Sequence, residues 1–304
     1  MSPHVLLECV PTGQPGQPLA LSEQRGYFVS GSGAPVVMLH ASLSSKSQWT
    51  PLAQRLASRY RVIAVDLAGY GDQAMPSRPE TFSLDTEVDL VESRLRRVVA
   101  PGTPVHLVGH SYGGLVALRF ALRHRNRLAS LSLYEPVAFR LLDQHDPELA
   151  ATEQMARRIS ELLNAGRRAE ATRTFVDFWG GSGAYIALPP ATRESIERRC
   201  DKVPLDFKAA WAWPMTSSEL GAIDTPTLLM LGHHSPRVTH NIHGTLTRIL
   251  PNRSIGLFDA GHMGPISDAY RVNRWIESFI DLCASRDTRT LDPIAEGTQA
   301  LAIR

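Results

Sequence analysis

The chain has 304 residues, of which 43% are hydrophobic and 20% charged, and its formal net charge at pH 7 is +2. This is the composition of a globular protein that can bury a full core, and it excludes a chain that is disordered throughout. Because acidic and basic residues are dispersed, nothing indicates nucleic acid as a partner, and we expect a small molecule instead.

Cysteine usage and hydropathy indicate where the protein is found. Cys9, Cys200 and Cys283 are odd in number and lack the paired spacing of a zinc site or a disulfide framework, which favours a reducing compartment. No window of the sequence reaches the ~18 apolar residues needed to span a bilayer. We therefore expect a cytoplasmic protein with no membrane span.

Short β-rich runs alternate along the chain with amphipathic stretches of helical period. This alternation is typical of an α/β protein with a mostly parallel central β-sheet and helices on both faces. In chain order, the predicted strands are 27–30, 35–39, 62–66, 105–109, 131–134, 227–231 and 254–258. The predicted helices between them are 48–58, 84–99, 112–124, 240–250 and 270–283.

The alternation stops in the middle of the chain. Predicted helices there follow one another without strands, at 147–164, 169–178 and 192–199. This pattern predicts an inserted helical cap over 137–215, carried by a core of 1–136 and 216–284. Residues 285–304 lack sustained periodicity and are expected to form a peripheral or disordered tail.

The run Gly109-His110-Ser111-Tyr112-Gly113 follows a predicted strand and begins a predicted helix, which is the setting of a G-x-S-x-G nucleophile elbow. So tight a turn strains the backbone of Ser111 and leaves no room for side chains at the two glycines. It also presents the Ser111 hydroxyl at the carboxyl edge of the sheet and directs the Tyr112 N–H at developing negative charge. A serine that only caps a loop is the alternative.

With this elbow the sequence resembles the α/β-hydrolase superfamily, over about residues 27–283. The run His40-Ala41-Ser42 is similar to the His-Gly-x turn that completes the oxyanion hole in that family. The resemblance assigns this role to the Ser42 N–H and a turn-holding role to His40. The run 66–71 is similar to the D-x-x-G-x-G turn of the family, in which Asp66 is structural.

His262 follows the last predicted strand, in a turn that has a glycine on each side. The order along the chain, with the nucleophile first and the histidine last, is the order that this fold uses. His262 is therefore the predicted general base, and an ordinary loop histidine is the alternative.

The acid of the triad is absent from its usual place in the superfamily, where this sequence reads Gly232-His233-His234-Ser235-Pro236. Asp224 lies at the opposite end of the preceding strand, and Asp259 is only three residues from His262. Glu135 directly follows the strand after the nucleophile helix, the position to which the acid has moved in haloalkane dehalogenases and some relatives. We predict that Glu135 orients the imidazole, since losing the carboxylate costs on the order of 10⁴ in rate. The alternatives are a residue that only anchors the cap, a Ser-His dyad and an inactive descendant.

Aromatic residues are frequent in the predicted cap. Those that face the elbow would build an apolar pocket, so the acyl or leaving group of the substrate is expected to have an apolar part. The aromatic residues are Phe139, Phe175, Phe178, Trp179, Tyr185, Phe207, Trp211 and Trp213.

The sequence therefore predicts a serine hydrolase that cleaves a carboxylic ester, thioester or lactone through an acyl-enzyme on Ser111. No cofactor and no metal are expected, because the histidines at 233, 234, 240 and 243 have no nearby cysteine or carboxylate to complete a ligand set. Dehalogenase and epoxide hydrolase chemistry is disfavoured, since those relatives use Asp where this chain has Ser111. Two alternatives stay open: acyl transfer or thioester cleavage on an acyl-carrier partner, and a non-catalytic ligand-binding protein.

Overall fold

The computed structural model describes residues 22–289, and an eight-stranded sheet lies at its centre. The strand order is β1-β2-β4-β3-β5-β6-β7-β8, and only the β1–β2 and β2–β4 pairs are antiparallel. The strands are β1 (Ser22–Gln24), β2 (Tyr27–Ser30), β3 (Pro35–Leu39), β4 (Arg61–Val65), β5 (Val105–His110), β6 (Leu128–Tyr134), β7 (Thr227–Gly232) and β8 (Arg253–Phe258). The predicted fold class is confirmed, and only β1, which has three exposed residues, was not predicted.

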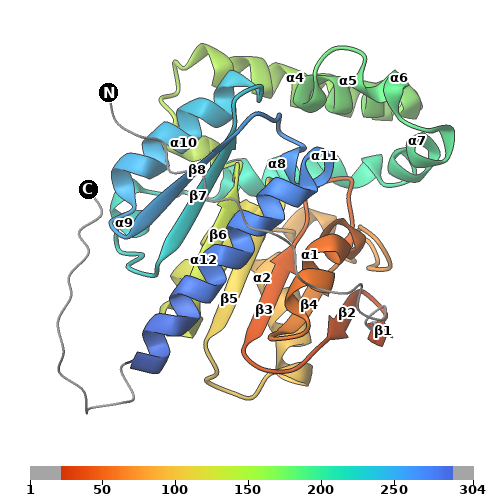
Figure 1. The fold of residues 1–304 in the computed structure, drawn as a ribbon. Helices are drawn as coiled ribbons and strands as arrows, with labels where there is room; N and C mark the ends of the chain where they lie inside the picture. The colour runs from red at the N-terminus through yellow and green to blue at the C-terminus, as the bar shows by residue number, and fades with distance from the viewer. Residues whose placement is uncertain (1–21, 290–304) are drawn as a thin grey trace.

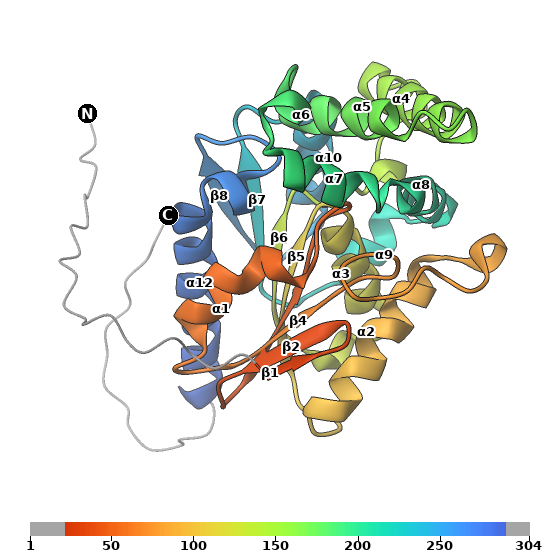
Figure 2. The same ribbon diagram turned by 90° about the vertical axis from the view of Figure 1, so that its right-hand side faces the viewer.

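Helices cover both faces of the sheet (Figure 2). One face carries α1 (Thr50–Leu56) and α12 (Ala269–Arg289), and the other carries α2 (Leu84–Val98), α3 (Tyr112–Arg123) and α10 (Arg237–Ile249). The apolar strands explain this arrangement, because successive side chains of a strand point to opposite faces. Val36 and Met38 of β3 belong to the core under α1 and α12, whereas Val37 and Leu39 belong to the core under α2 and α3.

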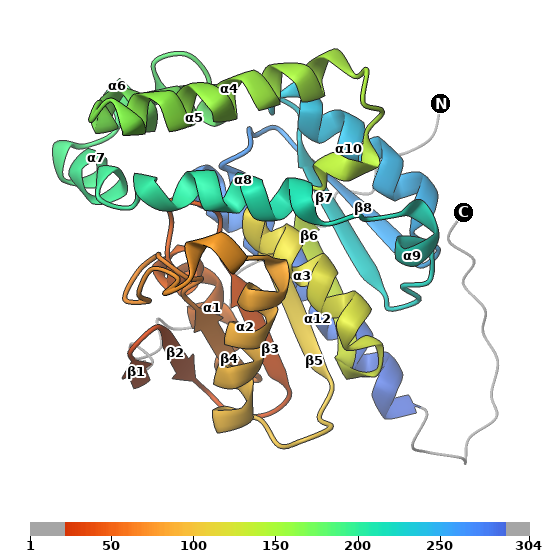
Figure 3. The ribbon, with the colours of Figure 1, turned by 180° about the vertical axis from the view of Figure 1, so that it is seen from behind.

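A layer of helices lies over the carboxyl edge of the sheet, between the end of β6 and the start of β7 (Figures 1 and 3). We call residues 147–212 the helical layer. Its helices are α4 (Pro147–Asn164), α5 (Arg168–Gly180), α6 (Ala184–Ala187), α7 (Pro190–Glu197) and α8 (Val203–Ala212). Helix α8 was not predicted, and the division into a core and a cap over 137–215 stays a prediction.

Two short helices complete the parallel part of the fold: α9 (Ser217–Gly221) before β7 and α11 (Gly264–Ser267) after β8. Helix α12 continues to Arg289, so the expected tail begins as helix, and its remainder, 290–304, lies outside the described residues, as does Cys9. Within residues 22–289, no helix has both the length and the apolar character that a bilayer crossing requires.

Candidate active site

Ser111 occupies a strained turn between β5 and α3. Its backbone has φ 55° and ψ −117°, a region that non-glycine residues rarely adopt. A Cβ at Gly109 would lie 2.6 Å from the Gly113 carbonyl oxygen, and a Cβ at Gly113 would lie 2.4 Å from the His40 carbonyl oxygen. Glycines at both positions therefore allow the helix to begin directly against β3 and β5.

The structure brings Ser111, His262 and Glu135 into one hydrogen-bonded chain. Ser111 Oγ lies 2.9 Å from His262 Nε2, and His262 Nδ1 lies 2.6 Å from Glu135 Oε2. All three side chains are buried. Since the carboxylate can only accept, Nδ1 carries the proton and Nε2 is free to accept from the serine. This is the geometry of a nucleophile, a base and an orienting acid.

Glu135 is held by the segment in which the superfamily usually carries the acid. Its Oε1 accepts from the Gly232 N–H at 2.7 Å and from Ser235 Oγ at 2.6 Å. Glu135 itself has a φ of 45°, so the chain turns sharply directly after β6. The end of β7 therefore supplies two donors to Glu135, and the carboxylate that contacts His262 directly follows the neighbouring strand β6.

The turn that carries His262 is fixed by a second histidine. His110 Nε2 lies 2.8 Å from the His262 carbonyl oxygen, to which it must donate, and its Nδ1 then accepts from Gln48 Nε2 at 3.1 Å. Burial holds the pKa of His110 well below its usual range, so this imidazole is neutral. Gln48 Oε1 also accepts from the Ala41 N–H at 3.2 Å, which ties the loop after β3 to the same chain of contacts.

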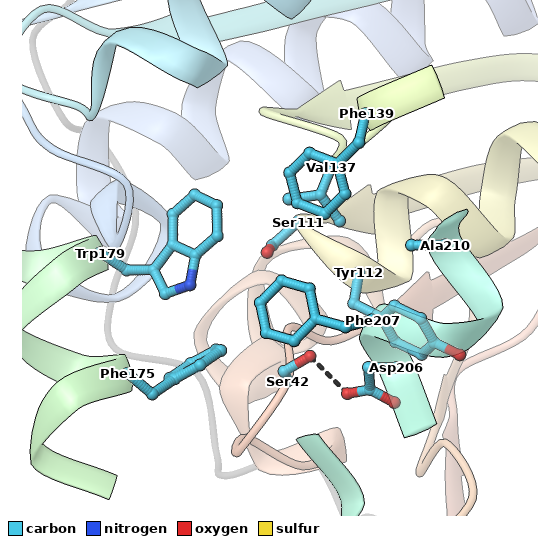
Figure 4. A pocket seen from close by; sticks show the side chains of 10 residues that line it. All are labelled: Ser42, Ser111, Tyr112, Val137, Phe139, Phe175, Trp179, Asp206, Phe207 and Ala210. Atoms are coloured by element: carbon cyan, nitrogen blue, oxygen red, sulfur yellow. Dashed lines mark hydrogen bonds between the residues drawn. The ribbon is translucent and has the colours of Figure 1, made fainter. Parts of the chain in front are cut away.

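Ser42 and Tyr112 line the same cavity as Ser111 (Figure 4). Tyr112 is the first residue of α3, so its N–H has no acceptor within the helix. The residue after Ser42, Leu43, has a φ of 61°, which marks a sharply bent loop at the end of β3. Ser42 and Tyr112 are thus both next to Ser111, and the oxyanion-hole role of their N–H groups stays a prediction.

The cavity beside Ser111 is small and mostly apolar. Its volume is about 20 Å³, enough for a water-sized group. Four of the aromatic residues noted in the sequence line it, together with Val137 and Ala210: Phe139, Phe175, Trp179 and Phe207. Trp179 stacks on the imidazole of His262, with ring centroids 4.5 Å apart.

Asp206 also lines this cavity, and sequence reasoning missed it. Its Oδ2 accepts from Ser42 Oγ at 2.5 Å and from Tyr70 OH at 2.5 Å, and its Oδ1 pairs with Lys202. Lys202 reaches Glu87 Oε1 at 3.1 Å, and all three charged side chains are buried. Burial alone would lower the pKa of Lys202, but Asp206 and Glu87 outweigh it and hold that pKa above its usual value. A buried ion cluster thus joins α8 to α2.

The remaining motif residues are structural. His40 Nε2 accepts from the Leu67 N–H at 3.0 Å, and Asp66 accepts from the Asp72 N–H at 3.0 Å, so both side chains hold turns, as predicted. Asp259 is exposed, and its Oδ1 lies 2.6 Å from His234 Nε2. Within residues 22–289, no three His, Cys, Asp or Glu side chains gather in a way that could hold a metal ion.

Known proteins share segments of this sequence. A probable lysophospholipase, BODYGUARD 4 of Arabidopsis thaliana, is 33% identical over 122 residues, which are 39% of this chain and 28% of that protein. A haloalkane dehalogenase of Agrobacterium fabrum is 32% identical over 138 residues, which are 43% of this chain and 42% of that protein. The chain therefore matches less than half the length of these relatives.

The fold and the family profile agree with these matches. A thermophilic esterase from Thermogutta terrifontis superposes with a TM-score of 0.68 at 23% identity, over 87% of this chain and 97% of that one, and so shares the fold. The profile of the family described as alpha/beta hydrolase fold matches residues 34–269, which is more than half of the chain. This protein therefore belongs to the alpha/beta hydrolase fold family.

Proposed function

We propose that this protein is a serine hydrolase that cleaves an ester-like acyl substrate through an acyl-enzyme on Ser111. One observation carries the proposal: the hydrogen-bonded chain from Ser111 through His262 to Glu135. Membership of a hydrolase family makes hydrolysis the expected type of reaction. A carboxylic ester, a thioester or a lactone fits the same residues.

The first half of the reaction acylates the serine. His262 Nε2 takes the proton of the Ser111 hydroxyl while Oγ bonds to the carbonyl carbon, and Glu135 stabilises the imidazolium that forms. The negative charge on the former carbonyl oxygen is stabilised by the N–H groups of Ser42 and Tyr112. When the bond to the leaving group breaks, His262 returns its proton to the departing atom.

Water releases the acyl group in the second half. His262 Nε2 takes a proton from the water molecule as its oxygen bonds to the acyl carbon, and that proton passes to Ser111 Oγ as the acyl bond breaks. The free acid leaves and the serine is restored. Water is the only reactant of this half-reaction other than the acyl-enzyme itself.

The cavity restricts the substrate. At about 20 Å³ it holds about one water-sized group next to Ser111, so a substrate with a longer acyl chain requires the cavity to widen. The apolar lining favours an apolar group beside the carbonyl. Dehalogenation is disfavoured for this chain, because the resemblance to the superfamily places Ser111 at the position of the dehalogenase aspartate.

The proposal is tested by covalent labelling and turnover. A fluorophosphonate probe should label the native protein and not the Ser111→Ala variant, and p-nitrophenyl esters of graded chain length should be hydrolysed by the unlabelled native protein and by neither the labelled protein nor Ser111→Ala. Ser132→Ala is the matched control, because Ser132 is a buried serine of β6 whose hydroxyl has no partner among the described residues.

Three outcomes separate the alternatives. Labelling with release of free acid supports the hydrolase. Labelling with transfer of the acyl group to an added alcohol, amine or carrier thiol indicates an acyltransferase. Ligand binding with neither labelling nor turnover at neutral pH would indicate a binding protein and contradict the proposal.

A further inference from the structure

Trp179 of α5 lies against the proposed base and on the wall of the cavity. Its indole stacks on the His262 ring at 4.5 Å with 29° between the planes, and meets Phe178 edge-on at 5.1 Å. The side chain is 5% exposed. Neighbours on two sides therefore fix the position of the indole.

The Trp179 Nε1–H is buried and has no acceptor among the described residues. Native proteins rarely leave a buried donor unpaired, so such a group calls for an explanation. Trp49 and Trp211 also have unpaired indole nitrogens, but Trp49 is fully buried in the core and Trp211 lines a separate surface groove beside α4. Among these three indoles, only that of Trp179 lines the cavity that contains Ser111.

Two of the other polar side chains that line this cavity already have hydrogen-bond partners. Ser111 Oγ is bonded to His262, and Ser42 Oγ donates to Asp206. The hydroxyl of Tyr112 is also buried without a hydrogen-bond partner within residues 22–289, but it points away from Ser111, whereas the indole nitrogen of Trp179 lies on the edge that faces the space between Ser111 and Phe175 (Figure 4). The Trp179 N–H is thus the side-chain donor that the cavity offers to a ligand.

We infer that Trp179 determines specificity, by donating its Nε1–H to an acceptor oxygen that the substrate carries within a few atoms of the reacting carbonyl. The inference rests on the proposed hydrolase function and names the substrate class: esters with an ether, keto or hydroxyl oxygen near the scissile bond. One neutral hydrogen bond of this kind raises kcat/KM by about 2- to 10-fold over an isosteric substrate without the oxygen.

Two matched pairs of substrates test this inference. In the first, p-nitrophenyl methoxyacetate is compared with p-nitrophenyl butyrate, which differs by an oxygen for a methylene in the acyl part. In the second, 2-methoxyethyl acetate is compared with n-butyl acetate, which makes the same exchange in the alcohol part. Each kcat/KM ratio is divided by the ratio of the hydroxide-catalysed rates, which removes intrinsic reactivity.

The wild-type protein should prefer the oxygen-containing member of at least one pair by about 2- to 10-fold, and the responding pair identifies the part of the substrate that Trp179 contacts. In Trp179→Phe the corrected kcat/KM ratio of that pair should fall to about 1. Phenylalanine keeps an aromatic ring against His262 but has no N–H to donate. Trp211→Phe, which removes an unpaired indole N–H outside the cavity, should retain the preference.

A wild-type protein that hydrolyses the esters with no preference in either pair overturns the inference without any variant. A Trp179→Phe variant that slows both members of a pair equally and keeps the preference overturns it as well. Failure of the proposed function looks different, since neither fluorophosphonate labelling nor turnover of any ester would then be observed.

Discussion

Two buried acids border the candidate site, and they differ in the partner that each one holds. Glu135, at the sheet edge, pairs with the imidazole of His262, whose other nitrogen reaches Ser111. Asp206, in the helical layer, pairs with the ammonium of Lys202, which also forms an ion pair with Glu87. A neutral imidazole can accept the proton of a serine hydroxyl, whereas an ammonium group has no free lone pair with which to do so. A buried carboxylate is therefore not a candidate catalytic group because of its burial alone. The group with which it pairs decides whether it can take part in a reaction.

Replacing Glu135, the carboxylate that contacts His262, should give the largest loss of activity. In Glu135→Gln the amide can still accept from Gly232 and Ser235, but its NH₂ group faces His262 Nδ1 and favours the wrong tautomer. We expect kcat to fall by roughly 10⁴, with little change in the denaturation midpoint. Steady-state kinetics on an ester that the native protein cleaves provides the measurement, and activity within about tenfold of native would show that Glu135 is not the acid.

A change in the buried cluster of Lys202, Glu87 and Asp206 should instead lower stability and leave activity nearly unchanged. Lys202→Met leaves Glu87 and Asp206 as buried carboxylates without their cation, which should lower the free energy of unfolding by about 3–5 kcal/mol. The kcat of the folded fraction should stay within about tenfold of native.

Urea denaturation measures the free energy of unfolding of Lys202→Met, and steady-state kinetics on the same preparation measures its kcat. Arg167→Met, which removes an exposed ion pair with Glu170, is the control and should change neither of them. Native stability in Lys202→Met would mean that the buried cluster does not join the helical layer to the core.

Acid should weaken the fold before it protonates ordinary carboxylates. Burial lowers the pKa of His40 to about 4, while the unfolded chain titrates near 6.5. Between these values only the unfolded state binds the proton, so stability falls as the pH falls through this window.

At pH 5 the loss from His40 is about 2 kcal/mol relative to pH 7, and the depressed pKa of His110 adds to it in the same direction. Denaturant titrations at pH 7, 6 and 5 measure this fall in the free energy of unfolding. A free energy of unfolding that is constant over this range would contradict the assignment of both histidines as buried and neutral.

The sheet edge could be predicted from the sequence because its requirements are local. Gly109 and Gly113 stand where any side chain would meet backbone, and Glu135 directly follows a strand whose apolar run is easily recognised. Parallel strands bring their carboxyl ends to one edge, so residues far apart in the chain converge there. The chain from Ser111 to Glu135 follows from these rules.

The ion cluster of the helical layer could not be predicted in the same way. Lys202 and Asp206 are four residues apart in the sequence, and on an isolated helix this spacing predicts an exposed ion pair. Their burial depends on Tyr70 and Glu87, which come from the core and are far away in sequence. The role of Trp179 was hidden for a related reason, since an aromatic residue in an amphipathic helix looks the same whether it fills a core or faces a substrate.

The proposed reaction transfers an acyl group to Ser111. The most direct measurement is peptide mapping by mass spectrometry after the protein is mixed with p-nitrophenyl acetate and quenched in acid, with Glu135→Gln included to slow turnover. We predict an acetyl group on Ser111 and on no other residue. Hydrolysis that continues with no acetyl group on Ser111, or with the group on another side chain, would contradict the account.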